Sequence, residues 1–193
     1  ELFVNRRGSF FYVPPAEAAL NSLFYALVTT GLSLGFGGLA AYALARRGAG
    51  ARLMDVLLML PLGTSAVTLG LGYLLTFNRP PLDVRSFPLL VPIAHSLVAL
   101  PFVVRTLLPA LRSIPPSLRQ AAAVLGASPR RVWWEVDWPV LGRAALVSAV
   151  FAFTISMGEF GATTFLANPE FPTLPVAIFR FLSQPGATNY GQA

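Results

Sequence analysis

One histidine and one serine are the only pair in this sequence whose types suit nucleophilic catalysis. His95 would act as the base and Ser65 as the nucleophile. Such a constellation needs the two side chains within hydrogen-bond reach of each other. Nothing in their spacing along the chain argues for that contact, so the residues do not favour an enzyme.

Two absent residue types exclude further chemistry. The chain has no Cys, which excludes a disulfide framework, a thiol nucleophile, an iron–sulfur cluster and Cys-ligated zinc. All 14 basic residues are Arg, and without Lys there is no P-loop, so the chain cannot itself be a P-loop ATPase. One His and eight acidic residues leave little for a metal site, and we expect neither metal nor cofactor.

The elements that must position these residues are long and apolar. Of the 193 residues, 55% are hydrophobic and 11% charged, whereas soluble domains carry about 25% charged residues. The neutral stretch 56–78 would span roughly 35 Å as a helix, enough for a hydrocarbon core of about 30 Å. We expect an all-α polytopic membrane helix bundle with about four full helices, near 18–45, 56–78, 87–111 and 144–166, plus the start of a fifth at 189–193.

Glycine and proline are frequent within these helices. The first contains Gly31, Gly35, Gly37 and Gly38, and small residues let helices approach closely. Helix breakers also interrupt the second and third predicted helices, at Pro61, Gly63, Gly70, Gly72, Pro92, Pro101 and Pro109. Kinked packing and a bundle that hinges around a pathway both explain this pattern.

The distribution of arginine predicts the orientation. Nine arginines flank one side of the predicted helices and five the other, so the richer side, with the loop 112–142, is expected in the cytoplasm. The N-terminus is then extracytoplasmic. Because the chain begins with Glu1 and ends in an uncharged stretch, we read it as a fragment that lacks at least one helix. The arginines lie at helix ends, where they meet lipid headgroups, and we expect no nucleic acid.

The loop 112–142 carries the clearest local pattern. The first of two predicted short helices begins at Pro115-Pro116, with Ser113 as its cap, and ends at Gly126. The second begins at Ser128-Pro129 and is ended by Pro139. A narrow apolar face on the first helix suits the groove of a partner protein. An interfacial helix on the membrane, with Trp133, Trp134 and Trp138 as belt aromatics, is the open alternative.

This loop resembles the EAA loop of ATP-binding-cassette (ABC) importer permeases, a pattern of Glu-Ala-Ala, three residues, Gly, nine residues and Ile-x-Leu-Pro. Gln120-Ala121-Ala122 precedes Gly126 at that spacing, and Val136-Asp137-Trp138-Pro139 takes the closing positions. Gln120 departs from the Glu of the family, which puts any salt bridge of that position in doubt.

The resemblance continues through residues 156–166 and 173–180, which look like the segment after the EAA loop in type I importers. Similar stretches occur in thiamine, ferric-iron, molybdate and sulfate permeases. The closing residues 184–193 lean toward the thiamine and ferric-iron branch, in which one chain often fuses two permease halves, and this chain would be a C-terminal half. A molybdate or sulfate permease is the alternative.

The resemblance implies a permease without catalytic residues of its own, in a bacterial cytoplasmic membrane. Implied partners are cytoplasmic ATPase subunits, an extracytoplasmic solute-binding protein, the lipid bilayer, and a second permease half in the same chain or as a second copy. Residues 119–126 would form the coupling helix in a groove of the ATPase. The coupling-loop residues are Arg119, Gln120, Ala121, Ala122, Gly126 and Pro139.

Three further residues are candidates for the pathway or for contact with the delivery protein. Glu159 is the one acid of the fourth predicted helix and lies roughly 24 Å from Arg143; it lines the path, holds the delivery protein or is solvated at the interface. His95 is a pathway group or a satisfied buried histidine. Ser65, like Thr64 beside it, presents a hydroxyl to solute or bonds to its own helix.

Two other classes of function remain as rivals. An intramembrane protease would need the contact between Ser65 and His95. An ATP-independent secondary carrier or channel should show internal repeats or paired intramembrane charges, and we see neither in these residues.

Overall fold

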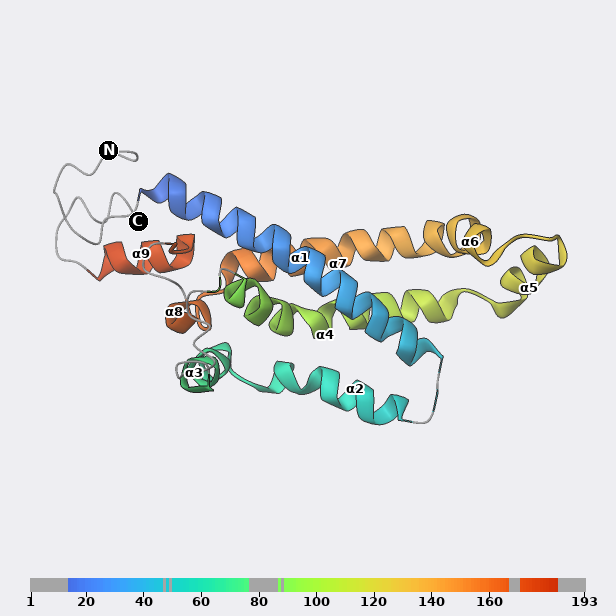
Figure 1. Ribbon diagram of the computed structural model, residues 1–193, viewed down its shortest axis with the longest axis horizontal. Coiled ribbons are helices and arrows are strands. Elements are labelled where there is room, and N and C mark those ends of the chain that lie inside the picture. Colours follow the sequence, from blue (N-terminus) through green and yellow to red (C-terminus); the bar gives the residue numbers. More distant parts are fainter. Residues whose placement is uncertain are drawn as a thin grey trace.

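The computed structural model describes residues 14–46, 48, 50–76, 87, 89–166 and 171–183, and within them the chain forms helices and no strand (Figure 1). Three helical runs are long and apolar enough to cross a membrane: α1 (Pro15–Ala45), α4 (Leu90–Ser113) and the run Pro129–Gly158. A bent pair, Ala51–Gly63 with Ala66–Thr76, makes a fourth if it is one span. The fold is an all-α polytopic bundle, as the composition predicts.

Shorter elements complete the described chain. They are α2 (Ala51–Met59), the 3-10 turn η1 (Leu60–Gly63), α3 (Ala66–Thr76), α5 (Pro116–Val124), α6 (Pro129–Val132), the π turn η2 (Trp133–Asp137), α7 (Trp138–Gly158), α8 (Thr163–Leu166) and α9 (Leu174–Leu182). The predicted start of a fifth helix at 189–193, the tail 184–193 and Arg6, Arg7, Arg79 and Arg85 lie outside the described residues.

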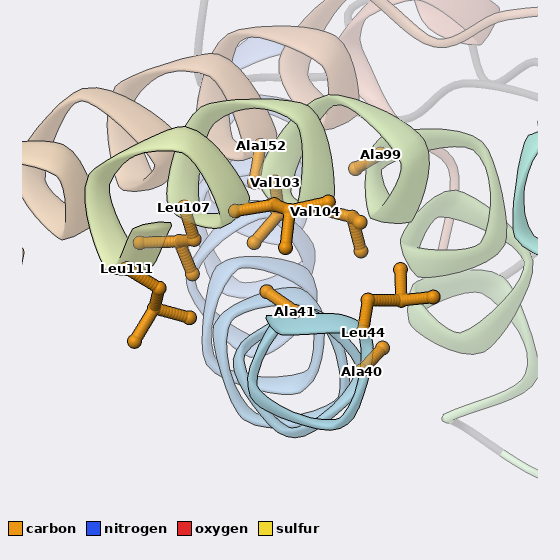
Figure 2. Packing of buried hydrophobic residues seen from close by; sticks show 10 residues of the cluster. Ala40, Ala41, Leu44, Ala99, Val103, Val104, Leu107, Leu111 and Ala152 are labelled. Atoms are coloured by element: carbon orange, nitrogen blue, oxygen red, sulfur yellow. The ribbon is translucent and has the colours of Figure 1, made fainter. Parts of the chain in front are cut away.

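The core forms around α4, which packs against both α1 and α7. Val103, Val104 and Leu107 of α4 meet Ala41 and Leu44 of α1, and Figure 2 shows these side chains pointing into the same space. Small residues on α1 such as Ala41 leave space for larger side chains on α4. Membrane helices, which the hydrophobic effect does not drive together, pack closely in this way. The bundle is therefore held by α1, α4 and α7.

Only one glycine of the first helix allows a close approach. A Cβ on Gly37 would lie 2.7 Å from Val103 Cγ1, whereas Gly31 and Gly35 face open space and Gly38 has its nearest neighbour at 3.9 Å. The expectation from the four glycines is thus met at Gly37, where α1 crosses α4.

The second predicted helix, over 56–78, is not one straight helix. Helix α2 ends at Met59, the chain passes through η1, and α3 leaves at 100° to the first part. Pro61 lies in η1, and Thr64 is extended. A proline ring and a missing N–H make a regular helix unstable there, so the break predicted at Pro61 and Gly63 is the site of the bend.

The prolines of the third helix behave differently. Helix α4 continues through Pro101 and Pro109, and Pro92 lies in its first turn. Pro101 is fully buried among neighbouring helices, a setting in which a membrane helix tolerates proline. The predicted interruption at these three residues is therefore wrong.

The fourth predicted helix, 144–166, has different bounds. The helical run begins at Pro129 and ends at Gly158, after which Glu159 is extended and α8 follows. Pro139 does not end a helix, because a π turn precedes it. At such a turn the regular hydrogen-bond ladder is already interrupted, so proline removes no bond that the helix requires.

Candidate functional site

The loop between α4 and α7 projects beyond the bundle, with α5 and α6 at its far end (Figure 1). Helix α5 starts after Pro115 without a side-chain cap. The hydroxyl of Ser113 donates instead to the Ala110 carbonyl (2.8 Å), so the predicted cap at Ser113 is wrong. Proline at the first turn removes an N–H that would need a cap, which leaves Ser113 free to close the end of α4.

Gly126 ends α5 in the manner its position predicts. It has a φ of +83°, a conformation that glycine adopts without the cost of a Cβ. Its N–H donates to the Ala123 carbonyl (2.9 Å), and that of Ala127 donates to the Ala122 carbonyl (3.0 Å). These are the two bonds of a Schellman motif. Ser128 then caps α6 by accepting from the Arg131 N–H (3.4 Å).

An ion pair joins the two sides of the loop. Arg119 Nε donates to Asp137 Oδ1 at 2.8 Å, and Asp137 is buried while Arg119 is half-buried. Asp137 is the last residue of η2. Because η2 continues without a break into α7, the pair fastens α5 to the 30-residue helical run. Sequence analysis placed Asp137 in the closing positions of the loop pattern but did not predict its pairing with Arg119.

Two exposed apolar groups lie on this loop. Val124 and Leu125, at the end of α5, are each 87% exposed, and α5 buries none of its residues. The other group is Trp133, Trp134 and Trp138, whose rings lie within 5.6 Å of each other. Gln120 is exposed on α5 and Ala122 is half-buried. A short helix with a bare apolar tip can enter a groove of another protein.

At the opposite end of α7, five polar side chains form a buried cluster. His95 Nδ1 lies 2.8 Å from Ser156 Oγ, and His95 Nε2 lies 2.7 Å from Thr163 Oγ1. Thr29 Oγ1 lies 3.2 Å from Ser156 Oγ, and Glu159 Oε2 lies 3.6 Å from His95 Nε2. None of the five is more than 8% exposed. The cluster joins α1, α4, α7 and α8.

Glu159 serves as the cap of α8. Its carboxylate accepts from the N–H groups of Ala162 and Thr163 (3.2 Å each) and from the Thr163 hydroxyl (3.1 Å). The expectation of a solvated carboxylate at the interface is therefore wrong, because the side chain is only 7% exposed. A carboxylate at a helix N-terminus satisfies N–H groups that otherwise lack partners.

The directions of these bonds follow from the carboxylate. An ionised carboxylate only accepts, so the Thr163 hydroxyl donates to Glu159. The Thr163 oxygen can then accept from His95 Nε2–H, while Nδ1 contacts the Ser156 hydroxyl, which also donates toward Thr29 Oγ1. Each ring nitrogen of a neutral His95 thus contacts a hydroxyl group, and His95 is a buried histidine within a polar cluster. Ser156 and Thr163, spaced three before and four after Glu159, were the signal that sequence reasoning did not use.

Ser65 does not join this cluster: its neighbour Ala66 packs near Gly161, but the ring nitrogens of His95 contact Ser156 and Thr163. Ser65 is exposed at the start of α3, and its carbonyl accepts from the Leu69 N–H (3.0 Å). The Thr64 hydroxyl donates to the Leu60 carbonyl (3.2 Å), which is the backbone alternative. Since both ring nitrogens of His95 contact other hydroxyls, the structure does not bring the serine and histidine together as a nucleophile and base. Among the described residues no group of three His, Asp or Glu side chains could hold a metal ion.

A family model described as "binding-protein-dependent transport system inner membrane component" matches residues 21–184, which include both the loop and the buried cluster. The chain belongs to this family. The description names an inner membrane component of a transport system that depends on a binding protein, in agreement with the resemblance of the loop to ABC importer permeases.

Curated relatives are transport permeases rather than enzymes. A molybdenum transport system permease protein of Haemophilus influenzae is 41% identical over 49% of this chain and 43% of its own length. A probable sulfate transport system permease protein of Chlorokybus atmophyticus is 35% identical over 88% of this chain and 65% of its own. A putative 2-aminoethylphosphonate permease of Salmonella typhimurium is 31% identical, over 84% and 62%. The chain thus spans about half to two thirds of these relatives.

Proposed function

We propose that this chain is the membrane-spanning permease part of a bacterial ABC importer, with the loop 112–142 in the cytoplasm. A second permease half, in the same chain or as a second copy, completes the solute path. A separate ATPase drives transport, and an extracytoplasmic protein delivers the solute. The observation that carries the proposal is the geometry of α5, a short helix with a bare apolar tip, fastened by Arg119 to a helix that runs the length of the bundle.

Helix α5 acts as the coupling helix in this proposal. Val124 and Leu125 supply the apolar surface that enters a groove of the ATPase. Closure of the ATPase pulls on α5, and the pair between Arg119 and Asp137 passes the movement to α7. The bundle then shifts between two states, because the ATPase contacts differ between them.

The solute is better assigned to the tetrahedral oxyanions than to thiamine or ferric iron. The residues 184–193 that favour thiamine and ferric iron lie outside the described part of the chain. The relatives are named for molybdenum, sulfate and 2-aminoethylphosphonate. Molybdate, sulfate and phosphonate groups all present three or four oxygens on a tetrahedral centre, and these names support the oxyanion alternative.

Reconstitution tests the function and the solute together. The full-length protein, its ATPase and its solute-binding protein are placed in lipid vesicles, and uptake of labelled molybdate, sulfate, thiamine and ferric iron is followed with and without ATP. ATP-dependent uptake of an oxyanion is expected. Uptake of thiamine or iron would overturn the solute, and uptake that ignores ATP would overturn the importer in favour of a secondary carrier.

Two variants test the role of α5. Leu125→Asp places a charge on the apolar tip and should lower ATP-driven uptake about 10- to 100-fold, the equivalent of losing one buried leucine. Glu135→Gln is the matched control, because Glu135 is also exposed on this loop and pairs only locally with Arg131. Gly126→Trp should uncouple transport by straining the turn at φ +83°. Normal uptake by Leu125→Asp, with the protein in the membrane, would refute the role.

A further inference from the structure

A groove with a charged pair lies between α4 and the broken helix that precedes it. Its volume is about 360 Å³, and it is lined by Asp55, Val56, Met59, Leu60, Gly63 and Arg105. The α2 and η1 segments that form one wall bury none of their residues. The groove therefore opens onto a thinly packed face of the bundle, next to the 100° bend.

Arg105 is only partly engaged in this groove. One terminal nitrogen lies 3.5 Å from Asp55 Oδ2, and Nε donates to Met59 Sδ at 3.2 Å. A guanidinium has five N–H donors in a planar fork, so donors remain for another acceptor among the described residues. The side chain of Arg105 is 55% exposed and that of Asp55 is 34% exposed. Such a pair, long and open to solvent, contributes little to stability.

The place of Arg105 in its helix calls for an explanation. The expectation that the arginines lie at helix ends is wrong for Arg105, which lies within α4 about 12 Å of helix before its end at Ser113. Charged residues at such depth face the bundle interior or a water-filled cavity and mark ion pathways. Asp55 Oδ1 is shielded from solvent and has no hydrogen-bond partner among the described residues. The pair of Arg105 and Asp55 therefore leaves hydrogen-bonding groups without partners among the described residues.

We infer that Arg105 binds the oxyanion solute on the cytoplasmic half of the path, and that Asp55 competes for the same guanidinium. This inference rests on the proposed function. The planar fork of arginine matches two oxygens of a tetrahedral oxyanion. A site on a transport path must release what it binds. Asp55 provides that release, because its carboxylate replaces the departing oxyanion at the guanidinium.

The reconstituted full-length system tests this inference with four variants. Arg105→Gln should reduce ATP-dependent uptake of molybdate or sulfate about 10- to 100-fold, as expected for loss of charge-assisted hydrogen bonds. Arg105→Lys keeps the charge but not the fork, and should lose uptake less severely. Asp55→Asn should retain uptake with a lower KM. Arg143→Gln is the control, because it removes one exposed positive charge of α7 without touching the groove.

The double variant separates solute binding from a structural ion pair. If the solute binds Arg105, the variant Arg105→Gln with Asp55→Asn transports as poorly as Arg105→Gln alone, while ATP hydrolysis stimulated by loaded binding protein persists. If the pair is structural, both single variants are equally harmful and the double variant recovers, which overturns the inference.

Uptake within twofold of wild type in Arg105→Gln also overturns the inference. Absence of oxyanion uptake in the wild type refutes the oxyanion assignment in the proposed function instead. Should Arg105→Gln fail to assemble, Arg105→Lys decides: uptake at the wild-type level refutes solute binding.

Discussion

Gly70 provides the sharpest test of how the bend in the second span is held. Helix α3 packs against α8 at this residue, and a Cβ there would lie 2.7 Å from Ala162 Cα and 2.9 Å from the Ala162 oxygen. Ordinary contacts begin at 3.4 Å, so Gly70→Ala must separate the two segments by about 0.7 Å. Both obstructing atoms belong to the backbone and cannot rotate away, in contrast to the end of a side chain.

The cost can be worked out against a residue two positions along the same helix. Overpacking costs about 1–3 kcal/mol, whereas Gly→Ala in a helix gains about 1 kcal/mol. Gly72 has nothing within 4 Å of its Cβ position, so Gly72→Ala should show only the gain. We expect the two variants to differ by about 1–3 kcal/mol, with Gly70→Ala the less stable.

Thermal unfolding of the purified full-length variants in one detergent measures this difference. A change of 1 kcal/mol moves Tm by about 2–4 °C in chains of this size, so Gly70→Ala should melt roughly 2–12 °C below Gly72→Ala. Equal Tm values for the two variants would refute the close packing of α3 on α8. Thr163 follows Ala162, so the same displacement should lengthen its 2.7 Å contact with His95.

Three more results are expected. Arg119→Ala and Asp137→Asn should each lower ATP-driven uptake about 10-fold, with no further loss in the double variant, because both break one contact; additive losses would contradict this. Glu159→Gln should lower the unfolding free energy by about 1–3 kcal/mol, since the cap of α8 loses its charge, as thermal unfolding will show; an unchanged Tm would exclude the cap. Gly37→Ala should melt below Gly35→Ala, because only the first faces a side chain at 2.7 Å; the reverse order would disprove the crossing.

The prolines show which helix breaks can be predicted from the sequence alone. Pro61, Pro101 and Pro139 are the same residue type in apolar surroundings, yet only the first lies at a break. Pro101 is tolerated because neighbouring helices enclose it, and Pro139 because a π turn precedes it. Local sequence does not contain either circumstance, so neither the continuity of the third helix through Pro101 nor the start of the fourth helical run at Pro129 could be predicted.

The residues of the candidate site were likewise predictable only where a local requirement fixes them. Gly126 was predictable as the end of α5, because a left-handed residue at that position is a local requirement. Glu159 and His95 were recognised separately, as rare polar groups in apolar stretches. Their common cluster was not predictable, because it depends on where α4 crosses α7 and on a turn that points the carboxylate back at α8.

The residues alone predict an all-α bundle of membrane-spanning helices, its expected orientation and the resemblance of the loop to importer permeases. These properties follow from the local distribution of charge, apolar length and turn residues, which need no neighbours. The folded structure was needed to show that Arg119 meets Asp137, that His95 meets Ser156 and Thr163, and that Arg105 faces Asp55 across a groove. Such contacts join residues far apart in the chain, and the packing of whole helices, rather than any local preference, sets which side chains meet.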